Sequence, residues 1–215
     1  NPAGLGYLNS VMFISNNARL YGLSDLKINN AGIVVPLEIL NIGLGYDEYG
    51  FDLYKEKTYM LSAAKKLSEN FSLGTSLKMY ELDISSVGKK SDVSIDAGFN
   101  YSAFNNKLSF GFLARDLNKP EISDKIDRSY SFGLKYIFSN FKLVVDYFIP
   151  KYDYDNRIFS GIELDLNRYV TLRSGIQTKP DNYSFGLGLN FGKINTLVLD
   201  YAYIHHQIMD ATHLF

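Results

Sequence analysis

Residues 183–191, near the carboxyl end of the chain, alternate strictly with a period of two. Every odd-numbered position is aromatic or aliphatic, and the positions between them hold only glycine, serine and asparagine. Successive side chains of a strand point to opposite faces, so this pattern predicts a strand with one apolar face and one narrow polar face. In a soluble sandwich the outward face usually carries Lys, Glu and Thr instead. The pattern is therefore typical of a transmembrane β-barrel with lipid outside and a hydrated lumen inside.

The composition of the 215 residues limits the function classes that remain open. A net charge of −1 gives no electrostatic footprint for nucleic acid, and no nucleic-acid partner is expected. The absence of cysteine excludes disulfides, thiolate nucleophiles and cysteine metal sites. There is no run of about 18 apolar residues, which excludes a transmembrane helix, and the mean hydropathy of −0.10 is compatible with barrel strands that are half wet.

The same alternation recurs along the chain and predicts fourteen strands joined by alternating short and long connections. Short turns and longer loops are the signature of an outer-membrane barrel, with the short turns in the periplasm and the longer loops outside. We expect long loops at residues 47–56, 85–91, 117–128 and 150–156. The expected strands are 10–22, 27–35, 38–46, 58–66, 68–84, 92–101, 107–116, 129–138, 141–149, 157–166, 168–177, 183–191, 194–204 and 211–215.

The expected fold is therefore all-β, a transmembrane antiparallel up-and-down barrel of about 14 strands. Lipid offers no partner for an open strand edge, so the sheet has to close on itself. We expect one barrel over residues 1–215, with residues 1–9 as a short periplasmic or plug remnant. An even strand number places both termini in the periplasm of a bacterium with an outer membrane. The alternative is a soluble all-β domain, which would be extracted without detergent.

Residues 1–6, Asn-Pro-Ala-Gly-Leu-Gly, resemble the opening of the FadL-like superfamily of outer-membrane barrels. The chain is most similar to the PorV/PorQ-type branch, through residues 67–78, 96–101 and 199–215. The resemblance implies a 14-stranded barrel. FadL-type members carry hydrophobic small molecules across the outer membrane past an N-terminal hatch, whereas PorV-type members bind and pass on substrates of a secretion system. Because this chain is shorter than typical members, we expect no full hatch, which argues against the FadL type of transport.

Charged residues of both signs fall on the polar face of neighbouring strands, where they would line the lumen. They can pair across strands and fill the lumen, because isolated buried charges are costly, or they can form a selective ion pathway. The mixture of signs argues against strong selectivity for anions or cations. The predicted lumen-lining residues are Lys78, Asp96, Arg115, Lys135, Lys142, Asp146, Glu163, Arg173 and Asp200.

No catalytic residue, metal site or cofactor is expected. His205, His206, Asp210 and His213 could supply metal ligands, but their spacing matches no compact site, and neighbouring strand residues point to opposite faces. The acidic residues of 116–127 alternate with basic ones, which favours a solvated loop over a calcium site. No serine, histidine and acid arrangement stands out, so an enzyme is not expected.

The first functional hypothesis is a non-enzymatic barrel that binds partners within an outer-membrane complex of the secretion type. Its expected partners are outer-membrane lipid and other outer-membrane or secreted proteins. Tyrosine and charge suit such contact surfaces, and they gather in the expected loops. The alternative is an outer-membrane channel or transporter for small hydrophobic solutes. The candidate partner-binding loop residues are Tyr49, Phe51, Lys119, Glu121, Asp124, Tyr152 and Tyr154.

Overall fold

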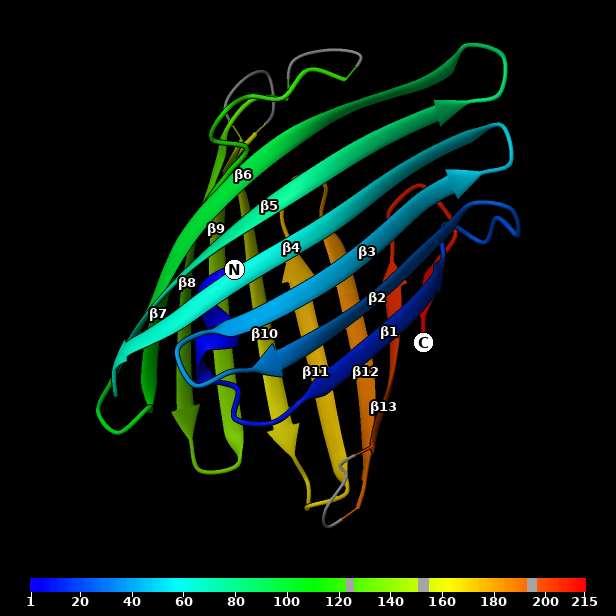
Figure 1. The fold of residues 1–215 in the computed structure, drawn as a ribbon. Coiled ribbons are helices and arrows are strands. Elements are labelled where there is room, and N and C mark those ends of the chain that lie inside the picture. The colour runs from blue at the N-terminus through cyan, green and yellow to red at the C-terminus, as the bar shows by residue number, and fades with distance from the viewer. Residues whose placement is uncertain (123–125, 151–154, 193–196) are drawn as a thin grey trace.

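The computed structural model describes residues 1–122, 126–150, 155–192 and 197–215. Its strands form one closed antiparallel barrel in which each strand pairs with its sequence neighbours and β14 pairs with β1 (Figure 1). The predicted fold class is confirmed. The strands are β1 Met12–Arg19, β2 Lys27–Pro36, β3 Asn41–Phe51, β4 Tyr54–Ser68, β5 Phe71–Ile84, β6 Gly88–Ala103, β7 Leu108–Arg115, β8 Ser129–Phe138, β9 Phe141–Pro150, β10 Arg157–Asp165, β11 Val170–Gln177, β12 Asn182–Phe191, β13 Leu197–His205 and β14 Thr212–Leu214.

The register places the apolar rows on the outside of the barrel. Leu187 of β12 pairs with Leu172 of β11 and with Tyr201 of β13, so three large apolar side chains lie side by side on the outer face. Phe185, in the same row, is 59% exposed. The described residues place no second protein layer over this face, which is the surface a lipid bilayer would cover. No helix in the described residues has the length and apolarity needed to cross a bilayer.

Aromatic rings cross four neighbouring strands on this outer face. The ring of Phe99 in β6 lies 6.0 Å from that of Phe71 in β5 and 5.7 Å from that of Phe112 in β7, measured between centroids. Phe112 continues the row to Phe132 of β8 at 5.0 Å. Cross-strand aromatic pairs at these separations contribute favourably beyond the area that they bury. The row therefore helps to hold β5–β8 in register.

The loops expected at 47–56 and 85–91 are wrong. Only Asp52 and Leu53 separate β3 from β4, and β6 already begins at Gly88. These strands extend beyond the apolar band as a sheet whose outer face is charged, with Lys57 3.4 Å from Glu81 and Lys89 3.2 Å from Asp83. In Figure 1 the β3–β4 and β5–β6 hairpins reach far beyond most of the barrel rim. At these strand ends the outward positions hold charged residues that pair across strands. The sequence therefore lacks hydrophobic alternation there and resembles that of a loop.

The upper part of β6 extends beyond its neighbour β7, which ends at Arg115. The segment after β7 covers the exposed edge of β6. The Leu117 N–H donates to the Ile95 carbonyl at 2.9 Å, and the Asn118 side chain donates to the Val93 carbonyl at 2.6 Å. A paired edge offers no template for another strand. The loop that follows β7 therefore begins as a fixed part of the wall.

The barrel closes through its shortest strand, β14. Leu214 pairs with Ala202 of β13 on one side and with Ala18 of β1 on the other. Asn17 and Phe215 add two backbone hydrogen bonds of 2.9 Å each. Thr212 is 2% exposed, and its hydroxyl lies 2.9 Å from His206 Nε2. Closure therefore depends on a few consecutive residues.

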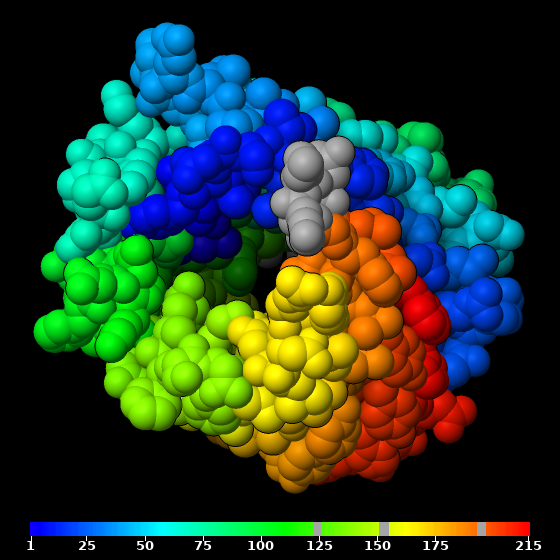
Figure 2. Space-filling view, turned by 90° about the horizontal axis from the view of Figure 1, so that it is seen from below, coloured from blue at the N-terminus to red at the C-terminus, as the bar shows by residue number. Residues whose placement is uncertain are grey.

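One short helix lies inside the barrel. The 3-10 helix η1, Pro2–Tyr7, packs against the inner faces of β4, β5 and β6. It is the dark blue segment behind β4 in Figure 1. Asn1 caps its first turn, and Pro2 occupies a position where a missing N–H costs nothing. The helix divides the lumen into a filled side and an open side, and Figure 2, viewed from below, shows a hollow next to it.

Candidate functional site

Asn1 anchors the start of η1 to the barrel wall. Its amide group donates to the carbonyls of Phe99 in β6 and Phe112 in β7, both at 3.0 Å, while its side-chain oxygen accepts from the Ala3 N–H at 3.0 Å. Gly98 makes this approach possible, because a Cβ there would lie 2.5 Å from the Asn1 side-chain oxygen. A glycine in the wall thus gives the helix its first attachment point.

The rest of η1 lies against β5 and β3. Ala3 is fully buried, and its carbonyl accepts a 2.8 Å hydrogen bond from the Ser72 hydroxyl of β5. Gly74 lies beside it, and a Cβ at this position would be 2.4 Å from the Ala3 nitrogen. Small inner residues on β5 therefore allow backbone-to-wall packing. The Asn41 amide of β3 donates to the carbonyls of Leu5 at 2.6 Å and Leu8 at 2.7 Å.

A buried ionic cluster fills the lumen next to β5 and β6. Lys78 is 5% exposed, and its ammonium lies 2.9 Å from a carboxylate oxygen of Asp96 and 2.9 Å from one of Asp116. Asp116 also accepts from the Tyr80 hydroxyl at 2.8 Å and from the Ser94 hydroxyl at 2.7 Å. Each charge has an opposite partner and further hydrogen bonds, as a buried ion pair requires. Such a satisfied cluster is rigid and leaves no room for a solute.

Asp116 is the first residue after β7, where the chain has a positive φ of 56°. Burial would raise the pKa of its carboxyl, but the hydrogen bonds from Ser94 and Lys78 outweigh burial and hold the pKa below its ordinary value. The group is therefore an ionised acceptor at neutral pH.

An ionic ladder crosses the opposite wall. Lys142 of β9 lies 2.5 Å from Glu163 of β10 and 3.2 Å from Asp165. Arg173 of β11 lies 2.6 Å from the other carboxylate oxygen of Glu163 and also pairs with Asp200 of β13. The ladder has three carboxylates and two cations, contributed by β9, β10, β11 and β13, so most of their charge cancels along the wall. This part of the lumen is polar and has a formal excess of one negative charge.

A cavity of about 870 Å³ lies between η1 and β7–β10. Its walls carry Arg115, Lys135 and Arg157 against one carboxylate, Asp146. None of the three cations forms an ion pair with a described carboxylate. A second cavity of about 540 Å³ adjoins the ladder and shares Lys135 with the first. The open side of the lumen is thus hollow, and the larger of its two cavities has a cationic lining.

Each predicted lumen-lining residue lies in one of these three regions; whether any of them acts on a solute stays a prediction. Lys78 and Asp96 lie in the buried cluster, Arg115, Lys135 and Asp146 line the larger cavity, and Lys142, Glu163, Arg173 and Asp200 form the ladder.

The sequence patterns missed Arg157, Asp165 and Asp116. Arg157 and Asp165 lie an even number of positions from Glu163, so strand alternation could have placed them on the same inner face. Asp116 could not be found in this way, because the strand ends before it and its positive φ turns the side chain inward. The role of Asn1 depends on contacts with strands about a hundred residues away.

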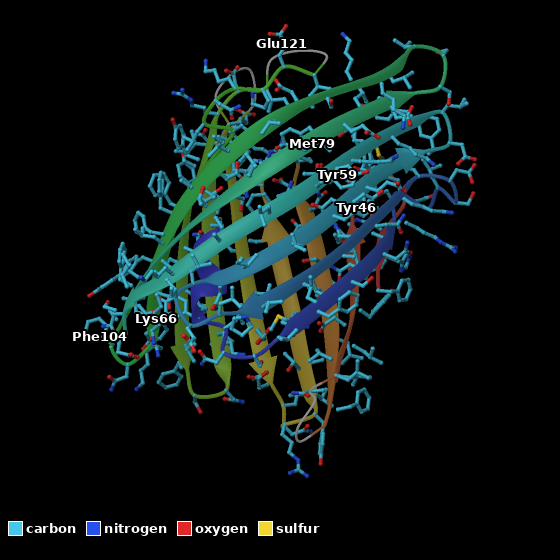
Figure 3. All side chains as sticks on the ribbon, in the orientation of Figure 1. Tyr46, Tyr59, Lys66, Met79, Phe104 and Glu121 are labelled. Carbon is cyan, nitrogen blue, oxygen red and sulfur yellow. The ribbon has the colours of Figure 1, made fainter. Side chains whose placement is uncertain are left out.

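The candidate partner-binding residues are spread over different elements. Tyr49 and Phe51 lie within β3, so their assignment to a loop is wrong. Lys119 pairs with Asp127 at 3.4 Å, and the Glu121 N–H donates to the Asp92 carboxylate at 2.6 Å. Figure 3 shows Glu121 at the upper end of the barrel, above β6. Asp124, Tyr152 and Tyr154 lie outside the described residues.

His206 and His213, near the carboxyl end, each make one side-chain hydrogen bond. The His213 ring nitrogen lies 2.8 Å from the Tyr201 hydroxyl, and His206 bonds to Thr212. Within the described residues, no group of three or more His, Asp or Glu side chains is arranged to hold a metal ion.

No protein-family model and no curated protein sequence matches the chain. Solved structures do match its fold. A FadL homologue from Pseudomonas aeruginosa superposes with a TM-score of 0.66 at 14% identity, covering 100% of this chain and 88% of that one. The Pseudomonas putida toluene transporter TodX gives a TM-score of 0.63 at 12% identity, covering 100% and 89%.

Porins are more distant neighbours. A mutant Rh. blastica porin superposes with a TM-score of 0.50 at 8% identity, covering 95% of this chain and 97% of the porin. At such identities the likeness concerns the fold alone. The chain has the closed 14-stranded antiparallel fold of FadL-type outer-membrane barrels.

Proposed function

We propose that the protein is a non-enzymatic outer-membrane channel for small hydrophobic solutes. The observation that carries this proposal is the hollow of about 870 Å³ between η1 and β7–β10. The filled half of the lumen is held rigidly by hydrogen bonds and buried ion pairs, so a solute has only the hollow half to pass through. The exposed apolar rows on the outer face support a location in lipid, and the fold supports the outer membrane of a bacterium.

The fold neighbours support the solute class. TodX is described as a toluene transporter and as a monoaromatic hydrocarbon channel, and one of its mutants superposes with a TM-score of 0.70 at 11% identity. Small hydrocarbons of this kind need a path past the hydrophilic outer leaflet rather than a wide water-filled pore. A lumen narrowed by a fixed helix on one side fits that need better than a wide porin channel does.

The test is uptake of radiolabelled toluene into vesicles with lipopolysaccharide in the outer leaflet. Vesicles that contain the protein should take up toluene several times faster than empty vesicles. A Ser131→Trp variant places a large ring in the cavity that Ser131 lines and should slow uptake to the empty-vesicle rate. The control, Leu77→Trp, adds the same ring to an outward position that is already 49% exposed and should leave uptake unchanged. Equal uptake by vesicles with and without protein would contradict the proposal.

Partner binding and membership of the PorV/PorQ-type branch stay predictions. Their test is recovery of co-purifying outer-membrane or secreted proteins from the native membrane. Substitution of the charges in residues 117–128 should abolish that recovery, and unchanged recovery would count against a binding role for this loop.

A further inference from the structure

Two guanidinium groups lie close to one phenyl ring at the wall of the larger cavity. The guanidinium carbon of Arg115, the last residue of β7, lies 5.7 Å from the centroid of the Phe148 ring, and that of Arg157, the first residue of β10, lies 6.0 Å from it. Contact with an aromatic face holds a guanidinium in place while its N–H groups stay available at the edge. The ring therefore positions two guanidinium groups at the wall of one cavity.

The guanidinium groups of Arg115 and Arg157 have N–H donors that are available to a ligand. Arg157 Nε is buried and has no hydrogen-bond partner among the described residues, which is unusual because an unmade hydrogen bond at a buried polar atom costs free energy. Within the described ranges, the hydrogen bonding of Arg115 is limited to a long 3.5 Å contact with the Ser131 hydroxyl. Lys135 also lines this cavity, and Asp146 is the only carboxylate that does so in the part of the chain that the structure describes. The cavity thus carries an excess of positive charge and a buried donor that a bound anion could satisfy.

The apolar lining next to these guanidinium groups is mainly aromatic. Phe148, Phe159 and Val144 line one side of the cavity, which is enough to cover a single aromatic ring. The rest of the lining contains Leu113 and Ile137 together with the polar residues Ser102, Ser109 and Asn106. A long alkyl chain would lie against these polar groups, whereas a ring-sized group would not reach them. The cavity lining therefore favours a compact aromatic body.

From this juxtaposition we infer that the larger cavity is a binding site for an arene carboxylate, with the carboxylate on Arg115 and Arg157 and the ring against Phe159 and Val144. This inference rests on the proposed channel function and extends its solute class to aromatic acids. Bidentate contact between a guanidinium and a carboxylate gives both strength and orientation. Asp146 opposes the bound anion and keeps its affinity moderate, as a channel requires for release.

The test measures binding of 3-phenylpropionate to the detergent-solubilised protein by titration calorimetry, with 3-phenyl-1-propanol as the neutral analogue. The carboxylate should bind about tenfold more tightly than the alcohol, in keeping with a charged hydrogen bond. Arg157→Gln and Arg115→Gln should each weaken carboxylate binding about tenfold and leave alcohol binding unchanged. Asp146→Asn should strengthen carboxylate binding severalfold, because it removes a repulsive charge.

The matched control is Arg168→Gln, which removes one positive charge at the exposed turn before β11 and should bind like the parent protein. The opposite signs expected for Arg157→Gln and Asp146→Asn distinguish an anion site from loss of structure. The inference is overturned if the alcohol binds as tightly as the carboxylate, if decanoate binds more tightly than 3-phenylpropionate, or if both arginine variants bind normally. The calorimetric results test only the anion site. The proposed channel function is tested separately, by toluene uptake into vesicles.

Discussion

A methyl group at Gly74 should loosen η1 from the barrel wall. In Gly74→Ala the new Cβ would lie 2.4 Å from the Ala3 nitrogen and 2.5 Å from the Pro2 carbonyl carbon. Both neighbours are backbone atoms, so no side-chain rotation relieves the contact. The helix has to move about 1 Å away from β5 to reach ordinary van der Waals separation. The wall itself is fixed by its ladders to β4 and β6.

The cost of that movement follows from the bonds that it breaks. Among the hydrogen bonds that attach η1 and its flanking residues to the wall, two come from Asn1, two from Asn41 and one from Ser72. The Ser72 bond, at 2.8 Å, comes from the strand that holds Gly74 and would pass beyond hydrogen-bonding distance. Losing this bond and weakening one more costs about 2 kcal/mol. The population with η1 detached should then rise about thirtyfold.

Hydrogen exchange measures that population. The amides of Gly4 and Leu8 donate within the N-terminal segment, to Asn1 and Leu5, and should exchange about thirtyfold faster in Gly74→Ala than in the parent protein. Gly45→Ala is the matched control, because its Cβ meets the Met60 Cβ at an ordinary 3.5 Å and η1 is not among its neighbours. Equal exchange in the parent and Gly74→Ala proteins would refute the argument that this glycine permits the helix to dock.

Three further predictions concern the charged groups. Lys78→Met leaves the buried carboxylates of Asp96 and Asp116 without their cation and should lower the free energy of unfolding in detergent by about 3–5 kcal/mol, whereas Lys135→Met should cost far less. The pKa of Asp116 is lowered in the folded protein, so its contribution to stability should be present above the unfolded pKa of about 4 and be lost as the pH falls below it; an Asp116→Asn variant should show a flatter pH profile of unfolding. Arg173→Gln removes the centre of a partly exposed ladder and should cost only about 1 kcal/mol in the same unfolding assay, because solvent screens these charges.

The strands could be predicted from sequence because each one is indicated by the alternation of neighbouring residues along the chain. In β12 every second residue is apolar, and the structure places that row on the outside and the glycine row on the inside. The prediction was wrong around Tyr49 and Lys89, where the strands leave the apolar band and their outer residues become charged. Alternation of apolar and polar residues depends on the environment of a strand as well as on its conformation. The alternation is therefore absent where both faces of the strand contact water.

The arrangement of the lumen was only partly predictable. Alternation could place Lys142 and Glu163 on an inner face, but their pairing depends on the register between β9 and β10. The position of η1 depends on Gly74 and Gly98, whose importance is visible only when a distant segment is packed against them. A glycine in a strand pattern indicates a bulge, a bend or a close approach, and the sequence alone does not distinguish these cases.

The two halves of the lumen narrow the passage by different means, so mutations can change its width and its charge independently. On the β4–β6 side, small inner residues such as Ser72 and Gly74 let a whole backbone segment occupy the interior. On the β9–β13 side, long side chains such as Lys142 and Arg173 are held along the wall by their ion pairs and do not extend freely into the bore. Detaching η1 should therefore widen the passage without changing its charge, whereas breaking the ladder should change its charge with little effect on its width. Single-channel conductance and reversal potential in a salt gradient measure these two properties independently. If both variants changed both properties together, the lumen would behave as one coupled unit and the division described above would be wrong.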